Sequence, residues 1–151
     1  MLNLPEVSLT TRKTSKGGLE VFDIVRKKYV SLTPEENVRQ HFIHYLIHDK
    51  TYPASLIAVE KGLTVNKLKK RFDAVAYNNK GEPLVLIEFK SPNVKISQAV
   101  FEQISVYNIE LKVKYLIVSN GLQHYCCMID YNKSEIVFLE GIPNYKEISG
   151  A

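Results

Sequence analysis

Residues 84–90 form an apolar run that ends in Glu88, Phe89 and Lys90, and this run constrains the fold more than any other feature of the chain. Apolar side chains on both faces are typical of a central strand in a sheet that is covered on both sides. Because side chains alternate along a strand, Glu88 and Lys90 lie on one face of it. An ionised carboxylate in such a strand costs several kcal/mol unless a cation or hydrogen bonds compensate it. The run therefore predicts an α/β domain with a compensated charge in its sheet.

A second acid, Asp73, interrupts the otherwise apolar residues 71–77. The turn-forming residues 78–81 join this segment to residues 84–90, so an antiparallel hairpin is expected. Two carboxylates on neighbouring strands repel each other, and a hard divalent cation such as Mg²⁺ (or Mn²⁺) relieves the repulsion through oxygen ligands. The acids therefore predict a metal site. Beside it, Lys90 would orient or deprotonate an attacking water or stabilise charge on a phosphate.

The other patterns give the order helix, three strands, helix, three strands. Thr33, Pro34 and Glu36 are typical of a capped helix start, and this helix is expected to end near His48. Periodicity predicts the remaining elements, namely strands at residues 55–65, 71–77, 84–90, 115–119, 124–130 and 135–139 and a helix at 97–111. Residues 1–20 have no regular spacing of apolar residues and predict an irregular arm. A single domain is expected at residues 21–151. It opens with a short segment at 21–30 that fits a strand.

The chain of 151 residues has a net charge of +4 that is unevenly distributed. Residues 1–95 hold 16 Lys and Arg against 10 Asp and Glu, whereas residues 96–151 hold 4 against 6. A basic excess near the proposed site is compatible with a phosphate backbone. No apolar run is long enough to cross a bilayer and no secretory signal is recognised, so a cytoplasmic location without a membrane partner is expected.

A dense basic run directly precedes Asp73, and it consists of Lys67, Lys69, Lys70 and Arg71. Its location favours contacts between these side chains and phosphates beside the site. The alternative interpretation is a solvated loop whose charges only keep it soluble.

These residues together resemble the PD-(D/E)XK nuclease superfamily. Asp73, followed one hairpin later by Glu88-Phe89-Lys90, is similar to its D…ExK signature. The pair Gln103 and Tyr107 is similar to the Gln-x-x-x-Tyr motif of the subgroup that includes the RecB nuclease and type I restriction enzymes. Three segments, at residues 33–40, 70–73 and 86–92, resemble the N-terminal nuclease domain of type I restriction enzyme R subunits, and the resemblance spans roughly residues 19–145.

The resemblance implies a restriction-endonuclease-like core, in which helices flank a mixed central sheet, and a Mg²⁺- or Mn²⁺-dependent DNA endonuclease. It implies Asp73, Glu88 and the main-chain carbonyl of Phe89 as metal ligands and Lys90 as the residue that assists hydrolysis. Gln103 and Tyr107 would support the site. Nothing in the sequence could encode the motor of an R subunit. The expected partners are DNA, a separate motor or specificity subunit and a second copy of the chain. Phe72 stands where the superfamily has its name-giving Pro.

Other interpretations stay open for several of these residues. Asp73, Glu88 and Lys90 would also suit a structural ion pair between strands. Gln103 and Tyr107, at i and i+4 and directed toward the sheet, would also suit a polar rim on an amphipathic helix.

Two further acids are ambiguous. Glu36 fits either a further acid near the metal or a capping box with Thr33, and Glu60 either faces the site or is a solvated acid of an edge strand. The rival function is a non-catalytic module that binds nucleic acid or a partner protein, and RNA or branched DNA are alternative substrates.

Overall fold

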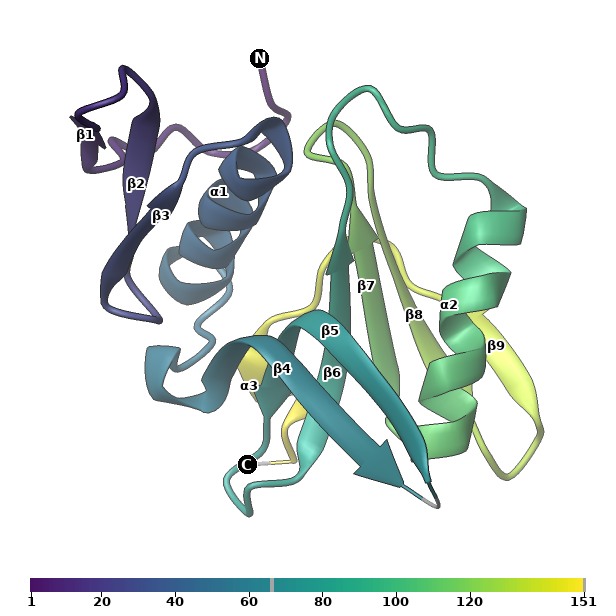
Figure 1. The fold of residues 1–151 in the computed structure, drawn as a ribbon. Helices are drawn as coiled ribbons and strands as arrows, with labels where there is room; N and C mark the ends of the chain where they lie inside the picture. The colour runs from purple at the N-terminus through teal and green to yellow at the C-terminus, as the bar shows by residue number, and fades with distance from the viewer. Residues whose placement is uncertain (66, 151) are drawn as a thin grey trace.

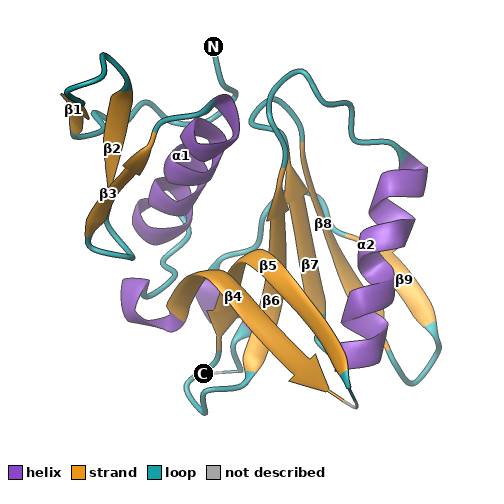
Figure 2. Ribbon diagram, viewed as in Figure 1, coloured by secondary structure: helices purple, strands orange, loops and turns teal. Residues whose placement is uncertain are grey.

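The computed structural model describes residues 1–65 and 67–150, which form two sheets and three α-helices (Figures 1 and 2). The helices are α1 (Pro34–His48), α2 (Gln98–Leu111) and α3 (Tyr145–Ile148), with a 3-10 turn, η1 (Ala54–Leu56), after α1. The strands are β1 (Thr11–Lys13), β2 (Leu19–Asp23), β3 (Lys28–Ser31), β4 (Ile57–Val65), β5 (Leu68–Tyr77), β6 (Pro83–Phe89), β7 (Tyr115–Ser119), β8 (His124–Asp130) and β9 (Glu135–Phe138).

The larger sheet has six strands in the order β4-β5-β6-β7-β8-β9. Its central pair, β6 and β7, is parallel, and every other neighbouring pair is antiparallel. A parallel pair needs a long crossover connection, and α2 provides it between β6 and β7. Figure 1 shows α1 and α2 on opposite sides of this sheet. The prediction of a mixed central sheet flanked by helices is therefore confirmed.

Two hydrophobic cores cover the two faces of the six-stranded sheet. Val38, Phe42 and Leu46 of α1 pack on one face, against side chains that include Ile87 and Phe89 of β6. On the other face, Phe101 of α2 packs in a core built around side chains such as Leu86, Leu116 and Val118. β6 is thus buried on both faces, as its apolar run predicts.

The hairpin predicted between the two acidic strands is present as β5 and β6. Its turn is closed by Asn78, whose side-chain oxygen accepts hydrogen bonds from the N–H groups of Lys80 and Glu82. Gly81 follows with a φ of +77°, which a residue without a Cβ adopts readily. A short turn of this kind places Asp73 and Glu88 on adjacent strands.

The N-terminal segment differs from the expectation. Thr11–Lys13 pair with β2, so the prediction of an irregular arm is wrong for these residues, and β2 begins at Leu19, before the expected boundary at residue 20. Residues 21–30 form parts of two strands, β2 and β3, instead of one. β1 is exposed along its length, so it carries no apolar period that the sequence could show.

The remaining differences are small. α3 is absent from the predicted order, and its Tyr145 hydroxyl donates a hydrogen bond of 2.8 Å to the Tyr77 carbonyl. Cys126 and Cys127 are buried free thiols. Within the described residues, no helix combines the length and the apolar character that a membrane span requires.

Candidate functional site

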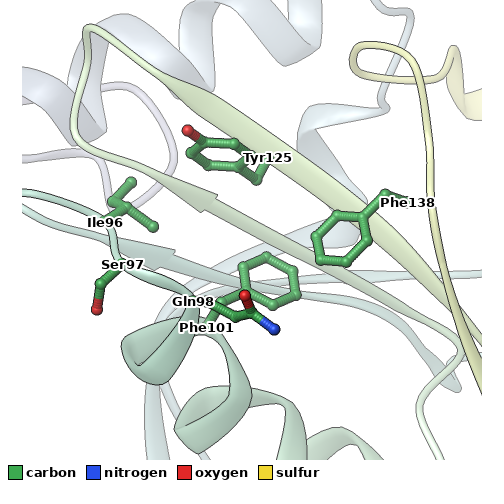
Figure 3. Close-up of a pocket in the computed structure, with 6 residues that line it drawn as sticks. All are labelled: Ile96, Ser97, Gln98, Phe101, Tyr125 and Phe138. Atoms are coloured by element: carbon green, nitrogen blue, oxygen red, sulfur yellow. The ribbon is translucent and has the colours of Figure 1, made fainter.

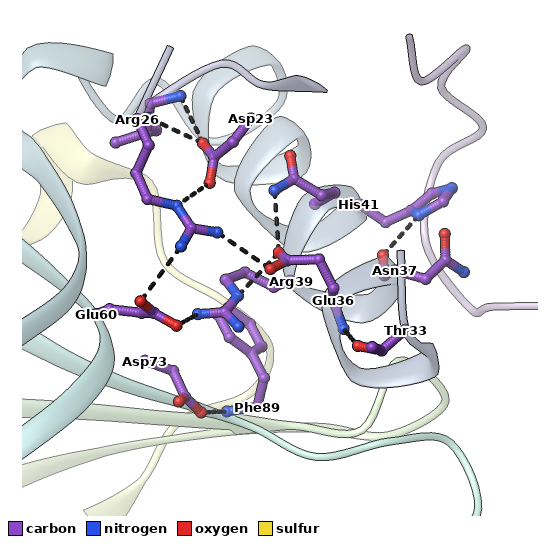
Figure 4. A network of polar contacts seen from close by, with 12 residues as sticks. Asp23, Arg26, Thr33, Glu36, Asn37, Arg39, His41, Glu60, Asp73 and Phe89 are labelled. Carbon is purple, nitrogen blue, oxygen red and sulfur yellow. Dashed lines mark hydrogen bonds and ion pairs between the residues drawn. The ribbon is translucent and has the colours of Figure 1, made fainter. Parts of the chain in front are cut away.

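Asp73 of β5 and Glu88 of β6 lie side by side in the sheet. Ala74 pairs with Ile87, which places Asp73 next to Glu88 at the following position of the two strands. The Phe89 N–H donates a hydrogen bond of 2.7 Å to Asp73 Oδ2 (Figure 4). The Asp73 carboxylate is therefore held by the backbone of the strand that carries Glu88.

The Glu88 side chain is buried without a complete set of partners. It is 7% exposed, and its Oε1 has no hydrogen-bond partner among the described residues. Burial, the charge of Asp73 and a hydrogen bond with Asp73 raise the pKa of Glu88 to about 8, against the opposing effect of Lys70 and Lys90. Near neutral pH the metal-free pair therefore holds a proton that a bound cation would displace.

The raised pKa of Glu88 predicts that the metal-free protein loses stability as the pH rises from about 4.5 to about 8. The folded state keeps the proton in this window while the unfolded chain releases it, so the slope is at most about 1.4 kcal/mol per pH unit. Urea unfolding in EDTA at several pH values measures the effect. Glu88→Gln is expected to remove this component, and an identical pH dependence in wild type and variant would contradict it.

Lys90 follows β6 directly and shares by alternation the face of Leu86 and Glu88, which is the face that α2 covers. Its N–H donates a hydrogen bond of 2.9 Å to the Ser119 carbonyl, which anchors it to the end of β7. Its side chain is half-buried. Two residues of the predicted signature thus lie on adjacent strands, and the third directly follows one of them.

The Glu36 carboxylate is engaged by two arginines and a glutamine. The Thr33 hydroxyl accepts a hydrogen bond from the Glu36 N–H, so Thr33 caps α1. The Glu36 carboxylate does not close the capping box; it pairs with Arg26 at 3.1 Å and Arg39 at 3.0 Å and accepts a hydrogen bond from Gln40 (Figure 4). The Glu36 carboxylate therefore does not complete the capping box, and its role as a further acid near the metal stays a prediction.

The same network reaches Glu60, which stands opposite Asp73 in β4. Val59 pairs with Ala74 and Lys61 with Phe72, whereas Glu60 has a φ of +53°. Its carboxylate lies 3.3 Å from Arg26, 3.8 Å from Arg39 and 3.5 Å from Arg71. Arg26 and Arg39 were not singled out by their sequence pattern, since each becomes informative only when strands and helices from distant parts of the chain meet.

Arg26 itself is held by Asp23, whose carboxylate is fully buried. Asp23 accepts hydrogen bonds from the N–H groups of Val25 and Arg26 and from the Arg26 guanidinium. These bonds outweigh the effect of burial and lower the pKa of Asp23. The β2–β3 turn therefore presents Arg26 to α1 and β4 in a fixed position.

The predicted basic run divides into two groups. Lys70 is half-buried, and its ammonium lies 5.3 Å from the ring centroid of Tyr107 and 5.8 Å from that of Phe72. Lys67, Lys69 and Arg71 are exposed. The run is therefore not one uniform basic surface.

Gln103 and Tyr107 also separate in the structure. Tyr107 packs edge-to-face on Phe72 with 6.2 Å between ring centroids, whereas Gln103 is exposed. The expectation that both face the sheet is wrong for Gln103, because the buried stripe of α2 runs through Phe101, Ser105 and Asn108 and leaves Gln103 outside it.

No group of three or more His, Cys, Asp or Glu side chains that could hold a metal ion occurs in residues 1–65 and 67–150. A metal at the candidate site would rest on two carboxylates and a carbonyl. A separate cavity of about 290 Å³ lies between α2 and β8–β9 (Figure 3). Its lining residues are Ile96, Ser97, Gln98, Phe101, Tyr125 and Phe138. They include no carboxylate, imidazole or cation, so this cavity is not the candidate site.

The mixed sheet between α1 and α2, with Asp73, Glu88 and Lys90 on adjacent strands, has the arrangement of a restriction-endonuclease-like α/β domain. Residues 34–143 match the sequence model of the family described as type I restriction enzyme R protein N terminus, and the chain belongs to this family. No curated protein matches the chain.

A solved structure with a similar fold is a fragment described as an HsdR subunit of a type I restriction enzyme from Vibrio vulnificus YJ016. The two chains are 20% identical and superpose with a TM-score of 0.56. The match covers 78% of this chain and 24% of that chain, so the present chain corresponds to about a quarter of the fragment.

Proposed function

We propose that this domain is a metal-dependent DNA endonuclease that hydrolyses phosphodiester bonds in the cytoplasm. The observation that supports it most directly is Glu88, a buried carboxylate beside the fixed carboxylate of Asp73, because its Oε1 has no partner in the part of the chain that the structure describes. A buried carboxylate that lacks partners is costly to ionise, and a cation between Glu88 and Asp73 would remove this cost.

The donor set fits Mg²⁺ or Mn²⁺, because both prefer oxygen ligands. Asp73, Glu88 and the main-chain carbonyl of Phe89 would hold the ion, which would supply Lewis-acid stabilisation of charge on the phosphate. Glu36 has no place in this ligand set, because arginines already engage its carboxylate.

Individual side chains would contribute to the hydrolysis in distinct ways. Asp73 needs no reorientation, since the Phe89 N–H already holds it. Lys90, on the face of Glu88, would orient the attacking water or stabilise the charge that develops on the phosphate. Tyr107 would support the site from α2. Gln103 is exposed and would contact only the bound DNA strand.

Cleavage of supercoiled plasmid tests the proposal. We expect nicked or linear product in Mg²⁺ or Mn²⁺ and no product in EDTA. Glu88→Gln is expected to remove cleavage as well, because the neutral side chain no longer supplies an anionic ligand. Cutting that persists unchanged in EDTA or in purified Glu88→Gln protein would refute it.

A non-catalytic module that binds nucleic acid or a partner protein is the second candidate. It is favoured by the pairing of Glu36 with Arg26 and Arg39, which leaves two acids at the site where a third was expected. Under either proposal, a separate motor or specificity subunit and a second copy of the chain are candidate partners. RNA and branched DNA would be compared with duplex DNA in the same assay.

A further inference from the structure

We propose that Lys70 is a phosphate-contacting cation of the candidate site and that Tyr107 is a positioning residue that holds the Lys70 ammonium in place. This inference rests on the proposed function and extends it to a particular contact with the nucleic-acid backbone. It also assigns Tyr107 a role that acts through another residue.

Packing contacts place Lys70 on the side of the sheet that α2 covers. Lys70 and Phe72 are two residues apart in β5 and share a face, and Phe72 belongs to the core that α2 covers. Leu63, the β4 partner of Lys70, packs against the same core. Lys69 and Arg71 are exposed. The contacts of Lys70 with Phe72 and Tyr107, and not strict alternation along β5, place it on the face of Glu88.

Two aromatic rings hold the Lys70 ammonium. It lies 5.3 Å from the Tyr107 centroid and 5.8 Å from the Phe72 centroid, within the range of about 6 Å over which a cation is attracted to a ring face. The edge-to-face contact of Tyr107 with Phe72 orders both rings. Among the described residues, no carboxylate lies at ion-pair distance from Lys70. Its charge is held in position without being neutralised.

Lys70 lies on β5 and Lys90 directly follows β6, so each strand of the hairpin contributes one lysine on the face of Glu88. An ammonium is a compact point charge with three donors and is a common phosphate ligand, so Lys70 suits a phosphate that approaches the acids from the side of β5.

The first experiment measures DNA binding in EDTA, where cleavage plays no part. The probe is a fluorescein-labelled 20-base-pair duplex, titrated at several salt concentrations with wild type, Lys70→Met and Lys69→Met. Loss of one phosphate contact lowers the slope of log K against log salt by about 0.9. We expect this change for Lys70→Met and a smaller one for Lys69→Met, which removes a neighbouring exposed charge of the same sign. Equal slopes for wild type and Lys70→Met overturn the proposal, as does absence of binding.

The second experiment tests the positioning role of Tyr107. Tyr107→Phe keeps the ring face and is expected to bind DNA like wild type. Tyr107→Met keeps the apolar volume without the ring and is expected to weaken binding, but to have no further effect when combined with Lys70→Met. Equal losses from Tyr107→Met in both backgrounds would show that Tyr107 acts independently of Lys70. Tyr107→Leu replaces Tyr107→Met if thermal melting shows that the methionine variant is unfolded.

The result separates this inference from the proposed function. Binding that depends on Lys70, together with no cleavage in Mg²⁺, would refute the nuclease and keep the phosphate contact. Cleavage in Mg²⁺ with an unchanged salt slope in Lys70→Met would keep the nuclease and refute the contact.

Discussion

Replacing Lys90 by methionine is expected to lower the rate of DNA cleavage in Mg²⁺ by about 10²–10³-fold, the typical effect of removing one group that stabilises transition-state charge. Lys90 stands directly after β6, is anchored through its N–H to Ser119, and shares the face of Glu88. Methionine keeps much of the apolar stem and removes only the charged end. Single-turnover cleavage of supercoiled plasmid, with wild type and variant at equal saturating concentrations, measures the change.

Lys95→Met is the matched control, because Lys95 lies exposed in the loop between β6 and α2. It removes the same charge from the same part of the chain and is expected to cut at nearly the wild-type rate. Lys90→Arg restores the charge with a different shape and separates electrostatic from geometric effects. Wild-type cleavage by folded Lys90→Met protein would remove Lys90 from the mechanism.

Mg²⁺ is expected to stabilise the folded protein, because the ion binds the native carboxylate pair and not the unfolded chain. At about 100 times the dissociation constant the gain is about 2.7 kcal/mol, which for a domain of this size raises the melting temperature by roughly 5–10 °C. Glu88→Gln is expected to lose the gain. Thermal melts of both proteins with EDTA and with increasing Mg²⁺ measure it.

The same variant distinguishes a metal site from a structural ion pair. If Glu88 and Lys90 only neutralised each other, Glu88→Gln would destabilise the metal-free protein by about 3–5 kcal/mol, the cost of breaking a buried pair. At a metal site, Glu88→Gln relieves the repulsion with Asp73, so at pH 8.5 in EDTA the variant is expected to be at least as stable as wild type. Glu110→Gln, which removes an exposed acid of α2, controls for the change in net charge.

The elements that position the acids could be predicted because their signals are local. The apolar run of β6, the turn at Asn78 and Gly81 and the cap at Thr33 each lie within a few residues of the structure they specify. β7 and β8 have the predicted bounds for the same reason. Because a short turn sets the register of a hairpin, the pairing of Asp73 with Glu88 followed from residues close in sequence.

The N-terminal sheet and the partners of the charged side chains were decided by the tertiary structure. β1 is exposed and has no apolar pattern, so its pairing with β2 leaves little trace in the sequence. Glu36 pairs with Arg26 because the β2–β3 turn brings Arg26 to α1, a contact that no local sequence pattern specifies.

The sequence by itself determined the strands of the six-stranded sheet, the two long helices beside it and the neighbouring positions of Asp73, Glu88 and Lys90, because alternation and short turns act over a few residues. Only the tertiary structure decided that Lys70, and not its basic neighbours, lies over the Tyr107 ring. It also decided that Glu36 forms ion pairs with arginines. The sequence alone does not distinguish between charged side chains of the same sign. Which of them meets a given partner depends on how distant elements pack together.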